Sequence, residues 1–211
     1  MKGQQENYNS YMEKHIGKHV PYPDVSNTRY GSHGEAAATI IVYHNQFLTF
    51  MEFVRLGKDN SQVYTNIEKN FVNALQDTPT LTELCVLALY NVAVSRPFMK
   101  YVRLNGNILL MESFFQKKAN FLKSIAENPS LWMGDTEAYK TASLDGKEWD
   151  GWTLDVLGAV KKLSSTLPDL NDAIVAFLEG ARETFVDRFS DEFKKGGLQA
   201  QPSSARWQHC K

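Results

Sequence analysis

The chain has 211 residues, of which 43% are hydrophobic and 22% are charged, a composition typical of one globular domain with or without tails. Its net charge of −1 excludes a global positive field, so binding of nucleic acid would require a local basic patch. The two cysteines provide no framework of disulfide bonds, which indicates a reducing compartment.

Residues 1–31 are polar and rich in turn-forming residues, and their two prolines favour extended backbone over helix. We therefore expect an extended N-terminal arm. The first residues lack the apolar run of a secretory signal, and the apolar stretch 84–95 is too short to span a membrane. These features predict an intracellular protein, cytoplasmic or nuclear, that has no membrane partner.

Two amphipathic helices are expected after the arm. Ser32 and Glu35 have the spacing of a capping box, in which each side chain accepts a hydrogen bond from a free amide at the start of a helix. Apolar residues then return to one side of a helix over residues 32–56, and a similar spacing recurs over residues 62–76. Each segment is predicted to bury that side against a core.

The stretch 80–96 is apolar on every side, as expected of a helix at the centre of a bundle. Thr80 and Glu83 repeat the capping-box spacing at its start. Pro97 has no amide hydrogen and disfavours helix in the residue before it. The sequence therefore predicts that the buried helix stops just before this proline and that a short helix follows over residues 97–104.

Further helices are predicted over residues 107–128, 153–163 and 168–193, with a less regular segment between the first two. In the first of them, Lys117 and Lys118 are expected on the outer side. The absence of an alternating strand pattern favours an all-α fold, an irregular bundle of six to eight helices around the central apolar helix. The predicted organisation is an N-terminal arm (1–31), a helical domain (32–195) and a flexible tail (196–211).

Three basic residues, Arg96, Lys100 and Arg103, recur at helical spacing and share one face of the short helix after the buried one. A face of this kind suits the phosphate groups of DNA. Three basic residues on a helix are also an ordinary solvated surface, and the sequence leaves both interpretations open.

Carboxylates and tryptophans gather in the segment 145–152, which suits a pocket for a cation or a sugar, or else a turn anchored by its tryptophans. His33 and His44 form a looser set of titratable side chains. If the protein were an enzyme, the candidate pocket residues would be Asp145, Trp149, Asp150, Trp152, His33 and His44. The regularly spaced carboxylates of the last helix, Glu179, Glu183 and Asp187, are expected on a solvated face.

The sequence does not predict a metal site or a cofactor. His15 and His19 have the spacing of two ligands on one helical face, but Gly17 separates them and no third ligand is near in the sequence. The sequence also has no Gly-rich phosphate loop, no nucleophile elbow and no C-x-x-C pair. These absences argue against the common enzyme classes without deciding whether the protein is an enzyme.

The segment DVSNTRYGS, residues 24–32, resembles the Thr-Arg-Trp-Asn-Ser region of hAT-like transposases, with Tyr30 at the tryptophan and Gly31 at the asparagine. Residues 79–103 resemble stretches of mobile-element-derived proteins of filamentous fungi. As in those proteins, an SLDGKEW-like turn and an FLEGARETF-like helix follow. The resemblance covers about residues 24–197.

This resemblance implies a fragment rather than a working transposase, because no strand-rich segment is present to carry the acidic residues of an RNase H-like core. What remains would be the helical insertion, whose implied roles are to position DNA or to hold subunits together. The residues that the resemblance makes candidates for DNA binding are Arg29, Arg96, Lys100 and Arg103.

Three functional hypotheses follow. The first is a non-catalytic helical module, derived from a transposable element, that contacts DNA or a protein partner. The alternative is a small helical enzyme with an internal pocket that acts on an organic molecule. The third is a scaffold that forms homo-oligomers through aromatic-rich faces, since the chain has twelve phenylalanines and four tryptophans.

Overall fold

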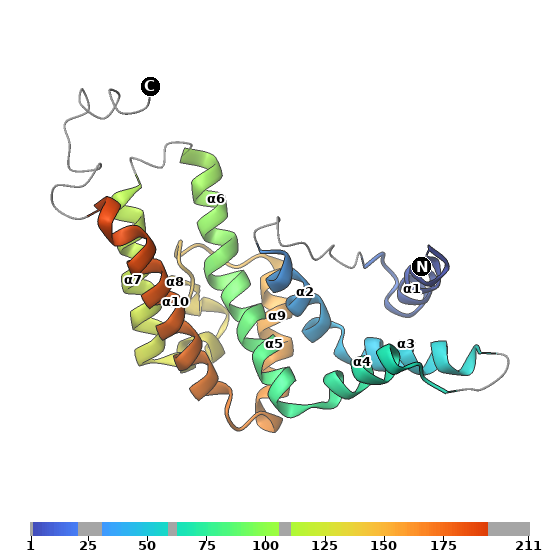
Figure 1. The fold of residues 1–211 in the computed structure, drawn as a ribbon. Coiled ribbons are helices and arrows are strands. Elements are labelled where there is room, and N and C mark those ends of the chain that lie inside the picture. Colours follow the sequence, from blue (N-terminus) through green and yellow to red (C-terminus); the bar gives the residue numbers. More distant parts are fainter. Residues whose placement is uncertain (1, 21–30, 59–62, 106–110, 194–211) are drawn as a thin grey trace. The chain divides into compact units, whose positions relative to one another are not determined.

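A computed structural model describes residues 2–20, 31–58, 63–105 and 111–193. Within these ranges the regular elements are helices and none is a strand, which confirms the predicted all-α class. The chain divides into two compact units, residues 1–91 with 155–170 and residues 92–154 with 171–211 (Figure 1). Arg29, most of the transposase-like segment and the predicted tail lie outside the described residues.

The first unit is built around α5, a helix whose side chains are buried over most of its surface. α2 lies along α5, whereas α3 contacts α1 and α4 (Figure 1). The unit also contains most of α9. Its helices are α1 (Lys2–Ile16), α2 (Ser32–Val42), α3 (His44–Leu56), α4 (Asn66–Gln76), α5 (Thr78–Tyr90) and α9 (Gly151–Leu163).

Helix α1 differs from the expected arm, because residues 2–16 are helical rather than extended. Tyr8 and Met12, one helical turn apart, are both buried, and the Tyr8 ring stacks on Phe47 of α3 with 5.9 Å between ring centroids. Gly17 follows in a left-handed conformation, φ 78°, which ends the helix. Tyr11 adds ring contacts to Phe50 and Phe53, so aromatic side chains of α3 hold one side of α1.

The predicted helix 32–56 forms two helices that meet at Tyr43. The physical reason is that the two halves have different partners, α5 for α2 and α4 for α3. His44 contributes to the second contact, because its Nε2 donates a hydrogen bond to the carbonyl oxygen of Leu75 at 2.6 Å. α2 starts after Gly31, φ 84°, without a hydrogen bond from a capping side chain, so the capping box predicted at Ser32 does not form.

The start of α5 is also capped differently from the prediction. The Asp77 side chain accepts a hydrogen bond from the Thr80 amide at 3.0 Å, and Pro79 occupies the first turn, so the helix begins at Thr78. The box formed by Thr80 and Glu83 in the sequence is not the cap that the structure uses. A complete capping box instead opens α4, where Thr65 pairs with Glu68.

α2 approaches α5 closely at one point, where Gly34 faces Asn91. A Cβ atom placed on Gly34 would lie 2.7 Å from the Cβ of Asn91, closer than side chains tolerate. Glycine is therefore needed at this position for the two helices to pack. The Asn91 side chain is buried, and its amide nitrogen has no hydrogen-bond partner among the described residues.

The helix does not stop at Pro97, because residues 78–105 are helical throughout. α5 passes into a π-helical turn, Asn91–Ser95, and then into α6, Arg96–Asn105. The wider turn accommodates the missing amide of Pro97 without ending the helix. The predicted stop and restart is thus replaced by a local widening.

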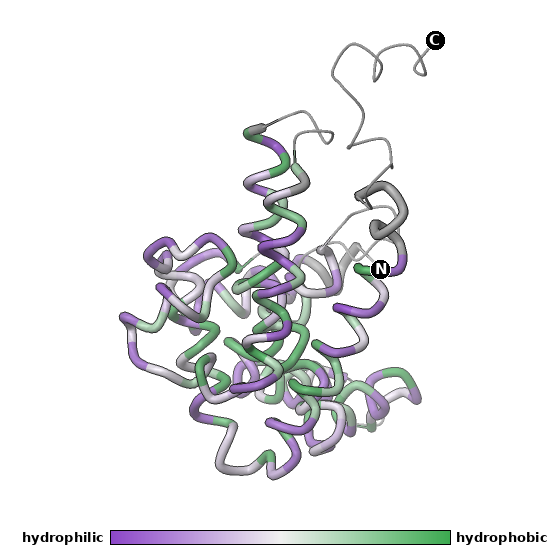
Figure 2. Tube along the Cα trace, turned by 90° about the vertical axis from the view of Figure 1, so that its left-hand side faces the viewer, coloured by the Kyte–Doolittle hydropathy of each residue, from purple (hydrophilic) through white to green (hydrophobic). Residues whose placement is uncertain are grey.

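The second unit contains α6, α7 (Glu112–Glu127), α8 (Tyr139–Ala142) and most of α10 (Leu170–Phe193). Phe98 of α6, Phe115 of α7 and Phe185 of α10 bring their ring centroids within 5.5–6.5 Å of one another. These aromatic contacts join the three helices. Figure 2 shows hydrophilic and hydrophobic residues alternating along the helices, the pattern of amphipathic packing.

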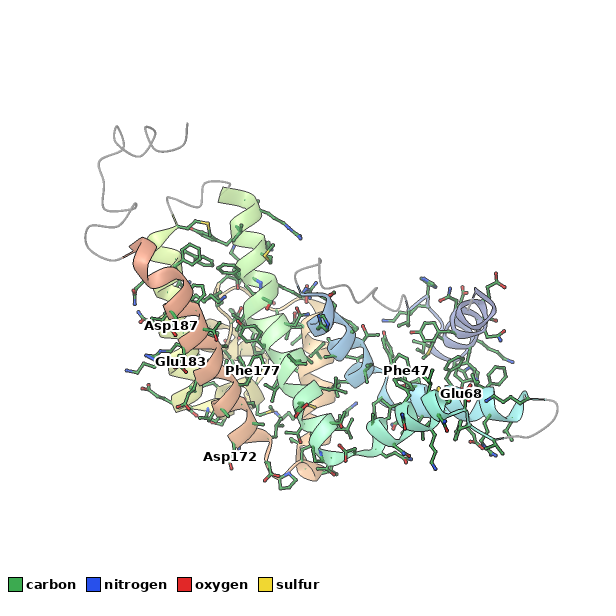
Figure 3. The ribbon with its side chains drawn as sticks, in the orientation of Figure 1. Phe47, Glu68, Asp172, Phe177, Glu183 and Asp187 are labelled. Carbon is green, nitrogen blue, oxygen red and sulfur yellow. The ribbon has the colours of Figure 1, made fainter. Side chains whose placement is uncertain are left out.

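The carboxylate stripe of α10 is exposed, as the sequence predicts. Glu179, Glu183 and Asp187 are all in the exposed class, and Figure 3 labels two of them along this helix. In the parts of the chain described above, no helix combines the length and the apolar character needed to cross a lipid bilayer.

Candidate functional site

A loop in the second unit is held against the π-helical turn by a hydrogen bond to the carbonyl of Ala93, four residues before Pro97. In an α-helix the carbonyl of Ala93 would accept the amide of residue 97, and proline has none. The amide of Leu144 donates to this oxygen instead, at 2.9 Å, and the Leu144 side chain is fully buried. Trp132 donates from its indole to the carbonyl of Ala142 at 3.1 Å. These two bonds fix the start of the loop.

The loop turns sharply at Asp145, whose Oδ1 accepts hydrogen bonds from the Ser143 hydroxyl at 2.8 Å and from the Lys147 amide at 3.2 Å. Gly146, between them, has φ 66°, a conformation that glycine adopts without steric cost. One oxygen of the Asp145 carboxylate is thus engaged within its own turn. The side chain of Lys147 remains exposed.

A half-open groove of about 450 Å³ lies between α6, α7 and this loop. Among the described residues its cations are Lys100, Lys117 and Lys147, one from each of the three segments, and its one carboxylate is Asp145, so these residues carry a formal charge of three minus one, or +2. The remaining lining residues are Pro97, Tyr101, Leu104, Ser113 and Phe114. The groove combines a positive rim with an aromatic and aliphatic surface.

Arg96, at the start of α6, is held by Asp150 at the end of the loop, with 3.6 Å between Nη1 and Oδ2. Partial burial raises the pKa of Asp150, but hydrogen bonds from Thr153 and the charges of Arg96 and Lys100 outweigh it, so the pKa lies below its ordinary value. Asp150 also caps α9 through the Thr153 amide at 2.8 Å. Arg96 is therefore partly neutralised, whereas Lys100 and Arg103 are exposed.

Lys118 differs from the prediction that it lies on the outer side of α7. Its side chain is 4% exposed and lies between the rings of Phe98 and Phe185, with Nζ 4.1 and 4.4 Å from their centroids. No hydrogen bond or ion pair to Lys118 occurs in the described ranges, and burial lowers its pKa to about 8. Lys118 follows Phe115 by three residues and precedes Leu122 by four, a spacing that places it on the apolar side of α7.

Of the predicted enzyme-pocket residues, Asp145 lines the groove and the other five do not. Trp149 is buried with its ring edge-on to Tyr139, and its indole nitrogen has no partner among the described residues. Trp152 is half-buried, and neither tryptophan lines the groove. In the first unit, His33 is exposed at the start of α2 and His44 bonds to a carbonyl oxygen.

Cys85 is buried in α5, and burial raises the pKa of its thiol to about 12, which keeps it protonated. Within the described ranges, no three histidine, cysteine, aspartate or glutamate side chains come together as metal ligands would.

Sequence reasoning identified Lys100 and Asp145, but it placed them in competing hypotheses, whereas the structure brings them to the same groove. It missed Lys117 and Lys147 as site residues. Comparison with protein families, with characterised proteins and with solved structures gave no match for this chain.

Proposed function

We propose that the protein is a non-catalytic helical module that binds nucleic acid, DNA in the first instance, through the groove of the second unit. The observation that carries the proposal is the convergence of Lys100, Lys117 and Lys147 from three segments, against one carboxylate, Asp145, among the lining residues that the structure describes. Lysine side chains that neutralise phosphates supply most of the affinity of non-specific nucleic-acid binding. The basic patch is local, as a chain of net charge −1 requires.

The three basic residues of α6 are not expected to contribute equally to binding. Lys100 lines the groove, Arg103 is exposed on the same helix, and Arg96 is held by Asp150. We expect Lys100 to contribute most of the three, because its charge faces the groove. The resemblance to mobile-element-derived proteins implies the same class of ligand, and derivation from such an element is part of this proposal.

The test is fluorescence anisotropy of a labelled duplex DNA titrated with the full chain. Three phosphate contacts predict that affinity falls about 40-fold between roughly 50 and 200 mM salt. Replacement of Lys100, Lys117 and Lys147 by alanine should remove most of this salt dependence. The matched control replaces three exposed lysines outside the groove, Lys123, Lys140 and Lys161, and changes the net charge by the same amount.

The control should retain binding within a few fold. Absence of binding at low salt both to this duplex and to a labelled single strand would refute the proposal, and so would equal losses in the two triple variants, because net charge rather than the groove would then determine affinity.

A contact with protein is a second candidate, favoured by exposed apolar side chains on α3, on α4 and in the segment just before α4. Phe53, Leu56, Val63 and Ile67 are between 51% and 82% exposed. Large apolar side chains in such positions are enriched in surfaces that contact other proteins. Light scattering at increasing concentration tests self-association, and a chain that stays monomeric would remove the homo-oligomer from consideration.

A further inference from the structure

Three near-parallel rings lead from the core of the second unit to the groove. Phe98 and Phe114 have ring centroids 5.9 Å apart and planes inclined by 14°. Tyr101 lies on Phe114 at 3.6 Å and 15°. Phe114 is buried and Tyr101 is half-buried, so the buried rings hold the ring of Tyr101 in place where it lines the groove. A ring that is oriented in advance loses little freedom when a ligand stacks against it.

The surface beside Tyr101 is apolar as well. Leu104, one turn further along α6, is 74% exposed and lines the same groove. The groove thus offers an aromatic and aliphatic surface next to the charges of Lys100, Lys117 and Lys147. A ligand that matches both parts has a flat apolar body and negative charges close to it.

We propose that the groove accepts an unpaired nucleobase against Tyr101 and Leu104 while the three lysines contact the adjoining phosphates, so that the protein prefers single-stranded nucleic acid. This inference rests on the proposed function and names its ligand class. Bases stacked on aromatic side chains, beside a basic groove that follows the backbone, are the general solution for single strands. The volume of about 450 Å³ lies in the range of sites for small ligands, which includes a single nucleotide.

A duplex contacts only the basic part of this groove and leaves its apolar part uncovered. Its phosphates reach the lysines, but its bases are paired and stacked internally, so Tyr101 and Leu104 would face sugar and water. A single strand brings the same charge and also covers the apolar residues. The difference in affinity between the single strand and the duplex therefore measures how much the apolar surface contributes to binding.

The experiment compares three labelled ligands of equal length at one salt concentration. They are a single strand of thymidines, a single strand of abasic sites and a duplex. We expect the thymidine strand to bind at least tenfold more tightly than the abasic strand. Tyr101→Leu should remove this advantage, whereas Tyr101→Phe, which keeps the ring, should retain it. The circular dichroism spectra of both variants show whether the fold is preserved.

The outcomes separate the two proposals. Salt-dependent binding of all three ligands with equal affinity would overturn the inference and leave the proposed function standing. Failure of all three to bind would overturn both. Binding to vesicles of anionic lipid, without binding to any of the three ligands, would also overturn both and assign the groove to a membrane surface.

Discussion

Replacing Lys118 with methionine should stabilise the protein, and the size of the effect follows from the burial of this side chain. Burial lowers the pKa of Lys118 from 10.5 to about 8, and a difference of one pH unit corresponds to about 1.4 kcal/mol. Keeping the buried Lys118 ammonium charged therefore lowers the free energy of unfolding by about 3 kcal/mol at pH 7. Attraction to the rings of Phe98 and Phe185 offsets up to about 2 kcal/mol of it.

The effect depends on pH in a defined direction. Between pH 8 and 10.5 the unfolded state binds more protons than the folded state, so the wild type becomes more stable as pH rises. Below pH 8 the cost of the buried ammonium is fully present. We expect Lys118→Met to gain about 1–3 kcal/mol in the free energy of unfolding at pH 7, and a smaller gain at pH 9.5.

Urea unfolding followed by tryptophan fluorescence at these two pH values measures the gain. Lys123→Met, at an exposed position on the same helix, is the control and should change stability little at either pH. Two results would refute the reasoning. One is a loss of stability in Lys118→Met at pH 7, because the ring contacts would then outweigh the burial cost, and the other is a gain that does not change with pH.

The remaining predictions concern the two units separately and are all measured by urea unfolding. Gly34→Ala should lower the free energy of unfolding by about 1–3 kcal/mol, because the new Cβ would clash with the Asn91 side chain. The control is Gly180→Ala, where a Cβ has open space and should not destabilise the protein. Equal effects of the two substitutions would contradict this reasoning. Asp77→Ala should be less stable than wild type at pH 7. Because hydrogen bonds from Thr80 lower the pKa of Asp77, this difference should disappear as the aspartate is protonated in acid; a difference that persists there would contradict the capping role. Gly146→Ala should cost roughly 1–2 kcal/mol, since φ is 66° there, and an unchanged midpoint would show that the turn relaxes.

The sequence was sufficient to predict the all-α class and most helices, because apolar periodicity is a local property. It was insufficient where the partner of a segment decides the structure. α1 is helical because Tyr8 stacks on Phe47, and the break at Tyr43 arises because α2 and α3 pack on different helices. The predicted caps failed for a related reason, since several residues near a helix start can cap it and only the packed structure selects one.

The site was predicted only in part. Helical spacing identifies Lys100, but the approach of Lys147 depends on the hydrogen bond between the Leu144 amide and the Ala93 carbonyl, which no local pattern contains. Lys117 and Lys118 are adjacent and chemically identical, yet one lines the groove and the other lies between two rings. Only the spacing of Lys118 to Phe115 and Leu122 distinguishes them in the sequence.

The hydrogen bond from the Leu144 amide to the Ala93 carbonyl makes the position of a charge in the groove depend on an irregularity inside a helix. Substituting Pro97 with alanine would add an amide four residues after this carbonyl, whose oxygen has two lone pairs and already accepts from Leu144. The turn that carries Asp145 and Lys147 is anchored at the same oxygen, so a substitution inside the helix acts on the groove although none of its three lysines changes.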